Sequence, residues 1–163
     1  MNLLSLTREH WPIVREIYLA GIASGDATFE TGAPSWEEWD AAHLKFARLI
    51  VCWDADVKGW AALSRVSARK AYEGVADVSV YVAADCRGQG YGKELLEGLV
   101  AGSENNAIWT LQASIFLENV ASIALHRTAG FREVGRRERI AKLNGVWRTT
   151  VLMERRSILV GTE

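Results

Sequence analysis

Cysteine is scarce in this chain: there are two among 163 residues. Cys52 and Cys86 form no C-x-x-C pair, and no histidine stands near them at metal-ligand spacing, so the sequence predicts neither a zinc site nor any other bound metal. We expect two reduced thiols rather than a disulfide, which is typical of a cytoplasmic protein.

Long apolar runs and an excess of charge are also lacking. No segment approaches the roughly 18 apolar residues needed to cross a bilayer, and the first residues show no secretory pattern. The formal net charge is -1, so no global field attracts nucleic acid or an anionic membrane. The length suits one domain. We therefore expect a single domain over residues 1–163, with neither a membrane nor a nucleic acid as partner.

Apolar periodicity and capping residues predict where helices and strands lie. Thr7 is expected to cap a first helix, and the S-x-x-E sequence from Ser35 to Glu38 predicts a second. A third helix follows a glycine-rich segment, and a fourth covers 119–129 and ends at Gly130. Strands are expected at Leu49–Trp53, Val57–Val66, Val75–Ala83, Ile108–Ile115, Phe131–Lys142 and Val146–Glu154. This order indicates a mixed α/β domain with a mixed rather than purely parallel sheet.

The glycine-rich segment contains Gly88, Gly90 and Gly92 between a strand and a helix. Such a turn leaves backbone N–H groups unshielded and suits a phosphate, although a tight connection without a ligand is an equally ordinary reading. The spacing does not match a nucleotide P-loop, which needs G-x-x-x-x-G-K-[ST]. It does not match the G-x-G-x-x-G dinucleotide fingerprint either, because these glycines recur at every second position.

What the segment does match is R-x-x-G-x-G, from Arg87 to Gly92, and the match continues downstream. The sequence from Asn119 to Phe131 fits N-x-x-S-x-x-L-H-x-x-x-G-F, and with both motifs in order the chain resembles the GCN5-related N-acetyltransferase (GNAT) superfamily. The resemblance implies the GNAT fold, a central, mostly antiparallel sheet flanked by helices, and acetyl-coenzyme A as cosubstrate. The residues that it implies for binding the cosubstrate are Val80, Tyr81, Val82, Arg87, Gly88, Gln89, Gly90, Tyr91, Gly92, Lys93, Asn119 and Ser122.

Acetyl transfer to an amine requires a group that accepts the ammonium proton, and Asp77 is the candidate. It is isolated on an otherwise apolar strand, although a strand-end acid can also simply point at solvent. R-x-A-Y from Arg69 to Tyr72, followed by D-x-S-V-Y-V from Asp77 to Val82, is similar to the phosphinothricin acetyltransferase group. That group carries glutamate where this chain has Asp77, so the carboxylate reaches about 1.5 Å less far and a bridging water becomes the expected route.

The resemblance also implies roles for the departing thiolate and the oxyanion. His126 stands where many superfamily members carry a tyrosine general acid, so it is expected to protonate the thiolate, with orientation of the substrate as the alternative. Asn119, Ser122 and His126 share one helix face by spacing, which could equally be a solvated face. The oxyanion is expected to accept a hydrogen bond from a backbone N–H on the strand before the glycine-rich turn.

Phosphinothricin-like substrates are small amino acids with an anionic end, which requires cationic partners. The residues proposed to contact the acceptor amine are Phe29, Glu30, Arg69, Tyr72, Lys142 and Trp147. The subgroup often continues its late G-x-W with His-Asp, whereas Arg148 and Thr149 follow here. Phosphinothricin, its arsenic analogue, methionine sulfone, methionine sulfoximine and an unrelated amine all remain open, and the resemblance implies a homodimer.

Three other interpretations compete with a small-molecule acetyltransferase. A regulatory module could keep the phosphate-binding turn and lose the chemistry, and the aspartate in place of glutamate at Asp77 is its best support. Acetylation of protein N-termini or lysines would favour a peptide groove, which the R-x-A-Y match opposes. A purely structural protein would use the glycines only to make a tight turn.

Overall fold

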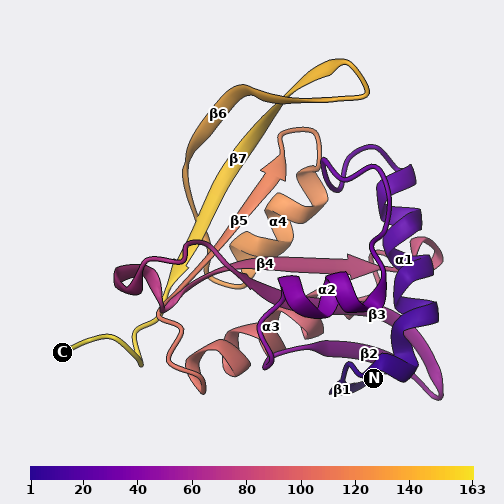
Figure 1. The fold of residues 1–163 in the computed structure, drawn as a ribbon, viewed down its shortest axis with the longest axis horizontal. Coiled ribbons are helices and arrows are strands. Elements are labelled where there is room, and N and C mark those ends of the chain that lie inside the picture. Colours follow the sequence, from indigo (N-terminus) through magenta and orange to yellow (C-terminus); the bar gives the residue numbers. More distant parts are fainter.

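The computed structural model describes all 163 residues as a seven-stranded sheet covered by helices on both faces (Figure 1). The strand order is β1-β2-β3-β4-β5-β7-β6, and every neighbouring pair is antiparallel except β4 with β5. The expected mixed, mostly antiparallel sheet is therefore confirmed. The strands are β1 (Asn2–Ser5), β2 (Leu49–Trp53), β3 (Asp56–Arg65), β4 (Val75–Val82), β5 (Thr110–Phe116), β6 (Arg132–Leu143) and β7 (Val146–Arg156).

The four α-helices are α1 (Trp11–Ala23), α2 (Trp36–Ala42), α3 (Tyr91–Glu104) and α4 (Val120–Thr128). Short 3-10 turns lie at Arg8–His10, Lys70–Tyr72 and Ala84–Cys86. The capping box predicted at Ser35 is present: its side chain accepts a hydrogen bond from the N–H of Glu38, and the N–H of Ser35 donates one to the carboxylate of Glu38. None of the helices combines the length and the apolar character that a membrane crossing requires.

At the amino terminus one sequence-based expectation was wrong and one strand was missed. Thr7 caps the 3-10 turn rather than α1, which begins at Trp11 with Pro12 in its first turn, the place where proline is tolerated. β1 was not predicted, because three of its four residues are exposed and the segment shows no alternation of buried and exposed positions. Its pairing with β2 supplies the order that the local sequence does not.

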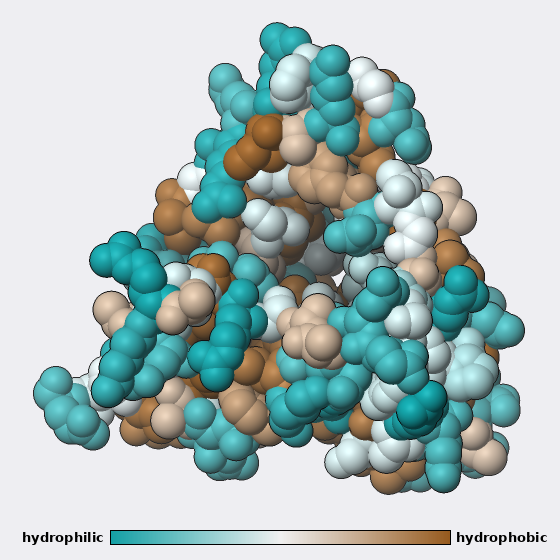
Figure 2. All heavy atoms as spheres, in the orientation of Figure 1, coloured by the Kyte–Doolittle hydropathy of each residue, from teal (hydrophilic) through white to brown (hydrophobic).

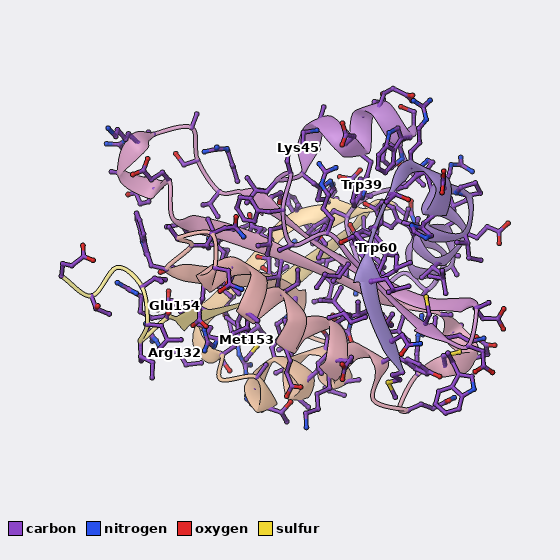
Figure 3. All side chains as sticks on the ribbon, turned by 90° about the horizontal axis from the view of Figure 1, so that it is seen from below. Trp39, Lys45, Trp60, Arg132, Met153 and Glu154 are labelled. Carbon is purple, nitrogen blue, oxygen red and sulfur yellow. The ribbon has the colours of Figure 1, made fainter.

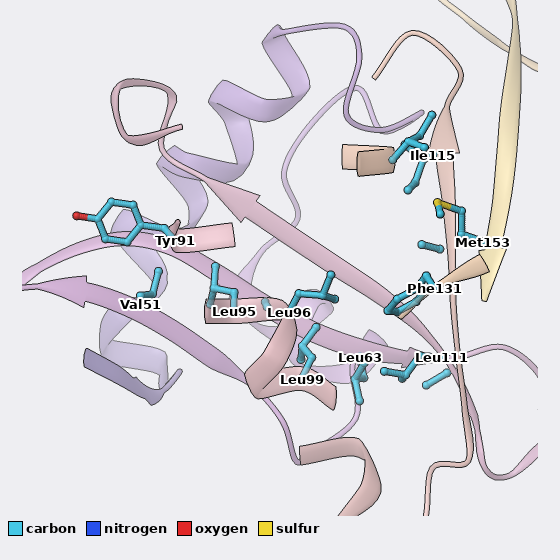
Figure 4. Close-up of a cluster of buried hydrophobic side chains, with 14 of the residues drawn as sticks. Val51, Leu63, Tyr91, Leu95, Leu96, Leu99, Leu111, Ile115, Phe131 and Met153 are labelled. Carbon is cyan, nitrogen blue, oxygen red and sulfur yellow. The ribbon is translucent and has the colours of Figure 1, made fainter. Parts of the chain in front are cut away.

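The face of the sheet under α3 and α4 carries the larger hydrophobic cluster (Figure 4). Leu95, Leu96 and Leu99 of α3 are fully buried there, against residues of β2, β3 and β5. The opposite face is covered by α1 and α2 and is rich in aromatic side chains. Trp39 of α2 lies edge-on to Trp60 of β3, with 5.7 Å between ring centroids (Figure 3). Both helical layers thus hold β3 and β4 rigidly at the centre of the sheet.

Truncation of the α3 face tests this description of the core. Leu95→Ala removes a fully buried side chain and is expected to cost about 2–5 kcal/mol of unfolding free energy, because the lost transfer energy and the cavity add. Leu159→Ala is the matched control, since Leu159 is 69% exposed and should change stability by no more than ~0.5 kcal/mol. Urea unfolding measures both, and equal effects would contradict the packing described.

Candidate active site

The candidate site lies where β4 and β5 separate. These parallel strands pair only from Val75 with Thr110 to Asp77 with Gln112, although β4 continues to Val82 and β5 to Phe116. Figure 1 shows the two strands diverging beyond that point, with α4 beside the opening. Figure 2 shows the same face hollowed near its centre. Two cavities meet there and share Ala27, Val80, Tyr81, Asn119 and Ser122 in their walls.

The opening exposes backbone groups of β4 that a sheet would normally pair. The N–H of Ala83 donates to the carbonyl of Lys58 on the β3 side, at 2.8 Å. Because bonding sides alternate along a strand, the N–H groups of Val80 and Val82 face the opening instead. An extended ligand could pair with them as a strand would, and either N–H could stabilise an oxyanion.

The first cavity, about 530 Å³, surrounds the glycine-rich turn at the start of α3. Arg87 and Lys93 bring positive charge to its wall, and the backbone N–H groups of residues 87–93 donate to no protein acceptor. Gly90 caps α3 with a φ of 92°, a left-handed conformation that favours glycine. A helix N-terminus with free N–H groups and two cations is suited to a diphosphate.

Most residues that the resemblance assigned to the cosubstrate meet in this first cavity. Its walls include Val80, Tyr81, Val82, Arg87, Gly88, Gly90, Gly92, Lys93, Asn119 and Ser122. Two others do not line it with their side chains. Gln89 donates to the carbonyl of Asp85 at 3.0 Å, and Tyr91 is 5% exposed in the hydrophobic core. These two contribute backbone to the turn.

The second cavity, about 480 Å³, lies on the Asp77 side of the opening and holds Phe29, Glu30 and His126 in its walls. Asp77 is half-buried rather than directed at solvent, and its Oδ1 accepts a hydrogen bond from Gln112 Nε2 at 2.8 Å. Burial raises the pKa of Asp77, opposed by that hydrogen bond. A carboxylate with a raised pKa beside a cavity has the properties of a general base.

His126 is 3% exposed, so the shared face of α4 is not a solvated one. Its Nδ1 lies 2.8 Å from the carbonyl oxygen of Ser122, which can only accept, so Nδ1 carries the proton of the neutral ring. Burial lowers the pKa of His126 and favours that neutral form. Nε2 is then an acceptor, and it has no partner in the protein; the same holds for Thr150 Oγ1 in the wall of this cavity.

The other four residues predicted to contact the acceptor lie outside both cavities. Arg69 lies over the Tyr72 ring at 5.7 Å in the β3–β4 loop, and Lys142 lies over Trp147 at 4.9 Å on the β6–β7 hairpin. Within one chain, the structure therefore does not bring these four side chains to Asp77.

Residues 24–30 form a wall of the site, and sequence reasoning did not identify what holds them there. Arg148 donates to the carbonyl of Gly25 at 2.7 Å and to carboxylate oxygens of Asp26 at 2.8 Å and Glu118 at 3.2 Å. Its guanidinium also lies 4.0 Å from the centre of the Phe116 ring. Arg148, which stands where the subgroup often has the histidine of His-Asp, thus fixes residues 24–30 in place. The absence of His-Asp after Trp147 was the sequence feature that could have pointed to this role.

The role of Arg87 in phosphate binding can be tested by substitution. Arg87→Gln removes one of its two cations and should weaken coenzyme A binding by about tenfold, because a charge-assisted hydrogen bond is lost. Arg65→Gln is the control, since Arg65 is exposed and lies outside both cavities. Calorimetry at two salt concentrations should also show a weaker salt dependence in the Arg87 variant. Equal affinities in the two variants would remove Arg87 from the site.

Comparisons with known proteins identify the family and support the fold. Residues 10–131 match the acetyltransferase (GNAT) family model. The chain is 33% identical over 150 residues to phosphinothricin N-acetyltransferase of Alcaligenes faecalis, covering 88% of this chain and 76% of that protein. It is 32% identical over 118 residues to the L-methionine sulfoximine/L-methionine sulfone acetyltransferase of Pseudomonas paraeruginosa, covering 71% and 69%.

Among solved structures, a GNAT phosphinothricin acetyltransferase from Sinorhizobium meliloti in complex with acetyl-coenzyme A superposes with a TM-score of 0.89 at 26% identity, covering 99% of this chain and 91% of that one. The ribosomal-protein-alanine N-acetyltransferase of Brucella melitensis gives a TM-score of 0.88 at 26% identity, covering 96% and 100%. This chain belongs to the GNAT family and is an acetyl-coenzyme A-dependent N-acetyltransferase.

Proposed function

We propose that this enzyme acetylates the α-amine of a small amino acid of the phosphinothricin or methionine sulfone and sulfoximine type. The observation that carries the proposal is the half-buried Asp77, placed in a cavity of about 480 Å³ that adjoins the phosphate-binding turn. The size suits a small acceptor. The 33% identity to a phosphinothricin N-acetyltransferase supports the same class of substrate.

In the proposed mechanism, the amine loses a proton to Asp77, directly or through water, and its nitrogen attacks the thioester carbonyl carbon. The N–H groups of Val80 and Val82, which face the opening, are proposed to stabilise the negative charge that develops on the carbonyl oxygen. The carbon–sulfur bond then breaks, and the nitrogen gives up one of its two remaining protons, which passes directly or through water to the departing thiolate. The products are the amide and the thiol of coenzyme A, and Asp77 returns its proton to solvent.

We assign His126 to orientation of the acceptor rather than to protonation of the thiolate. The bond from Nδ1 to the Ser122 carbonyl leaves Nε2 without a proton to donate, and burial disfavours the imidazolium that would have one. His126 also lines the Asp77 cavity and not the cavity around the glycine-rich turn. As a hydrogen-bond acceptor, Nε2 of His126 can instead bind the N–H of the substrate amine or a water molecule.

We further propose a homodimer, in which the exposed hairpin and the β3–β4 loop of one protomer approach the acceptor cavity of its partner. Trp147 is 47% exposed and Tyr72 is 44% exposed, and both carry a stacked cation. In this arrangement, Arg69 and Lys142 of one protomer could contact the acceptor bound to its partner, which they do not reach within a single chain. Sedimentation analysis of the purified protein tests the state of assembly, and a monomer would contradict it.

A substrate panel tests the proposed function directly. We expect thiol release from acetyl-coenzyme A with phosphinothricin, methionine sulfone or methionine sulfoximine, and not with a peptide that begins with alanine. The expectation rests on the volume of the acceptor cavity, about 480 Å³, which suits a small molecule. Release with the peptide alone, or with none of the amines, would contradict the proposal.

Replacement of Asp77 tests the chemistry. Asp77→Asn keeps the size and hydrogen bonding but removes basicity, so turnover at neutral pH should fall by ~10²-fold or more. Because the free-base fraction of the amine increases with pH, the loss should shrink toward the pKa of the amine, while Asp77→Glu should stay active. Initial rates across neutral and alkaline pH measure both. A variant that matches the parent at every pH would exclude Asp77 as the base.

The assignment of His126 makes a separate prediction. His126→Gln should raise KM for the acceptor, because an orienting group is lost, and the ratio of variant to parent turnover should stay flat from neutral to alkaline pH. A general acid would behave differently: the parent would lose its advantage as imidazolium disappears with rising pH. Rate profiles of both proteins separate the two, and a ratio that changes with the titration of one group contradicts the orienting role.

A further inference from the structure

The acceptor cavity contains negative charge without a matching positive charge. Glu30 and Asp77 are the charged residues in its walls, and no lysine or arginine joins them. An amino acid brings a carboxylate as well as an amine, and a carboxylate in a protein site is normally held by a guanidinium or an ammonium. An amino-acid acceptor of the proposed function therefore needs a cation that the walls of the cavity do not provide.

Strand registers identify which cations share the open face of the sheet with Asp77. Asp77 pairs with Gln112 on β5, and side chains at every second residue lead on that face to Phe116. Phe116 pairs with Thr150 on β7, and Thr150 pairs with Arg137 on β6. Arg137 therefore projects from the same face as Asp77, directly beside a residue in the wall of the acceptor cavity.

Four arginines lie on this face by strand register, and three of them already have partners within the protein. Arg156, opposite Thr110, donates to backbone carbonyls of the C-terminal segment. Arg132 is ion-paired with Glu154, which lies opposite Gln112, and Arg148 is held by Asp26 and Glu118.

Arg137 lies between these two positions and forms no ion pair. The residue two positions before it is Gly135, where an added Cβ would meet no atom within 4 Å, so the space beside Arg137 is open.

We infer that Arg137 binds the α-carboxylate of the acceptor amino acid while Asp77 takes the proton of its amine. The inference rests on the proposed function. The amine and the carboxylate are attached to the same carbon, so one bound ligand needs an acid and a cation near the same cavity, and these two residues project from the same face of the sheet around it. The positive charge of Arg137 already acts on Asp77, where it opposes the rise in pKa that burial causes. A flexible exposed arginine can close on the ligand once both groups are present.

The test compares an amino acid with its uncharged amide. Arg137→Gln should raise KM for methionine sulfone by about 10- to 100-fold, through loss of a charge-assisted hydrogen bond, with kcat and coenzyme A affinity nearly unchanged. KM for methionine sulfone amide should be the same in variant and parent. Arg137→Lys should have a KM for methionine sulfone between those of the parent and of Arg137→Gln. The control is Arg136→Gln, because Arg136 is the adjacent residue and is ion-paired with Glu133 instead.

The outcomes separate this inference from the proposed function. If the parent acetylates methionine sulfone and Arg137→Gln keeps the parental KM, the assignment of Arg137 is wrong and the function stands. If KM rises equally for the acid and the amide, Arg137 does not recognise the carboxylate. If the parent acetylates simple amines and no α-amino acid, the proposed function and the assignment both fall.

Discussion

The separation of β4 from β5 is the constraint on which the rest of the structure depends. Two parallel strands pair over three residues and then part, although both continue for several more. Unpaired backbone in a protein interior is costly, so an opening of this kind persists only where the surroundings enforce it. Here α3 and α4 pack on one face of the sheet, α1 packs on the other, and β7 fixes the far side of β5.

Charge is distributed unevenly on the two sides of the opening, and this distribution matches the two substrates. The side of the glycine-rich turn offers free N–H groups with Arg87 and Lys93, which suits a diphosphate, while the two acids in the same wall, Asp26 and Glu118, are paired with Arg148. The other side offers Glu30 and Asp77, which suits an ammonium group. Residues 24–30 contribute to the walls of both cavities, and Arg148 ties them down by bonds to Gly25 and Asp26. The reaction can then occur where the two cavities meet.

Local sequence patterns were sufficient to predict much of this arrangement. The capping box at Ser35, the glycine spacing from Gly88 to Gly92 and the left-handed Gly130 each depend on neighbouring residues. Asp77 could be recognised because a lone acid on an apolar strand is unusual. Which ring nitrogen of His126 carries the proton could not be predicted, because that depends on one backbone carbonyl of the folded helix.

The residues that sequence reasoning missed are those placed by long-range pairing. Gln112 reaches Asp77 from a strand that lies 35 positions away in sequence. Thr150 and Arg137 reach the acceptor side only through the registers of β5, β7 and β6, which no local pattern specifies. The cations proposed from sequence, Arg69 and Lys142, lie in the β3–β4 loop and near the end of β6, outside both cavities of a single chain.

A crystal structure of the complex with coenzyme A and an acceptor amino acid tests the central claim most directly. We expect the thiol sulfur in the opening between β4 and β5, where the two cavities meet. We also expect the acceptor nitrogen to contact Asp77, directly or through one water. An acceptor bound elsewhere, with Asp77 facing only solvent, would contradict the claim that this opening is the reaction centre.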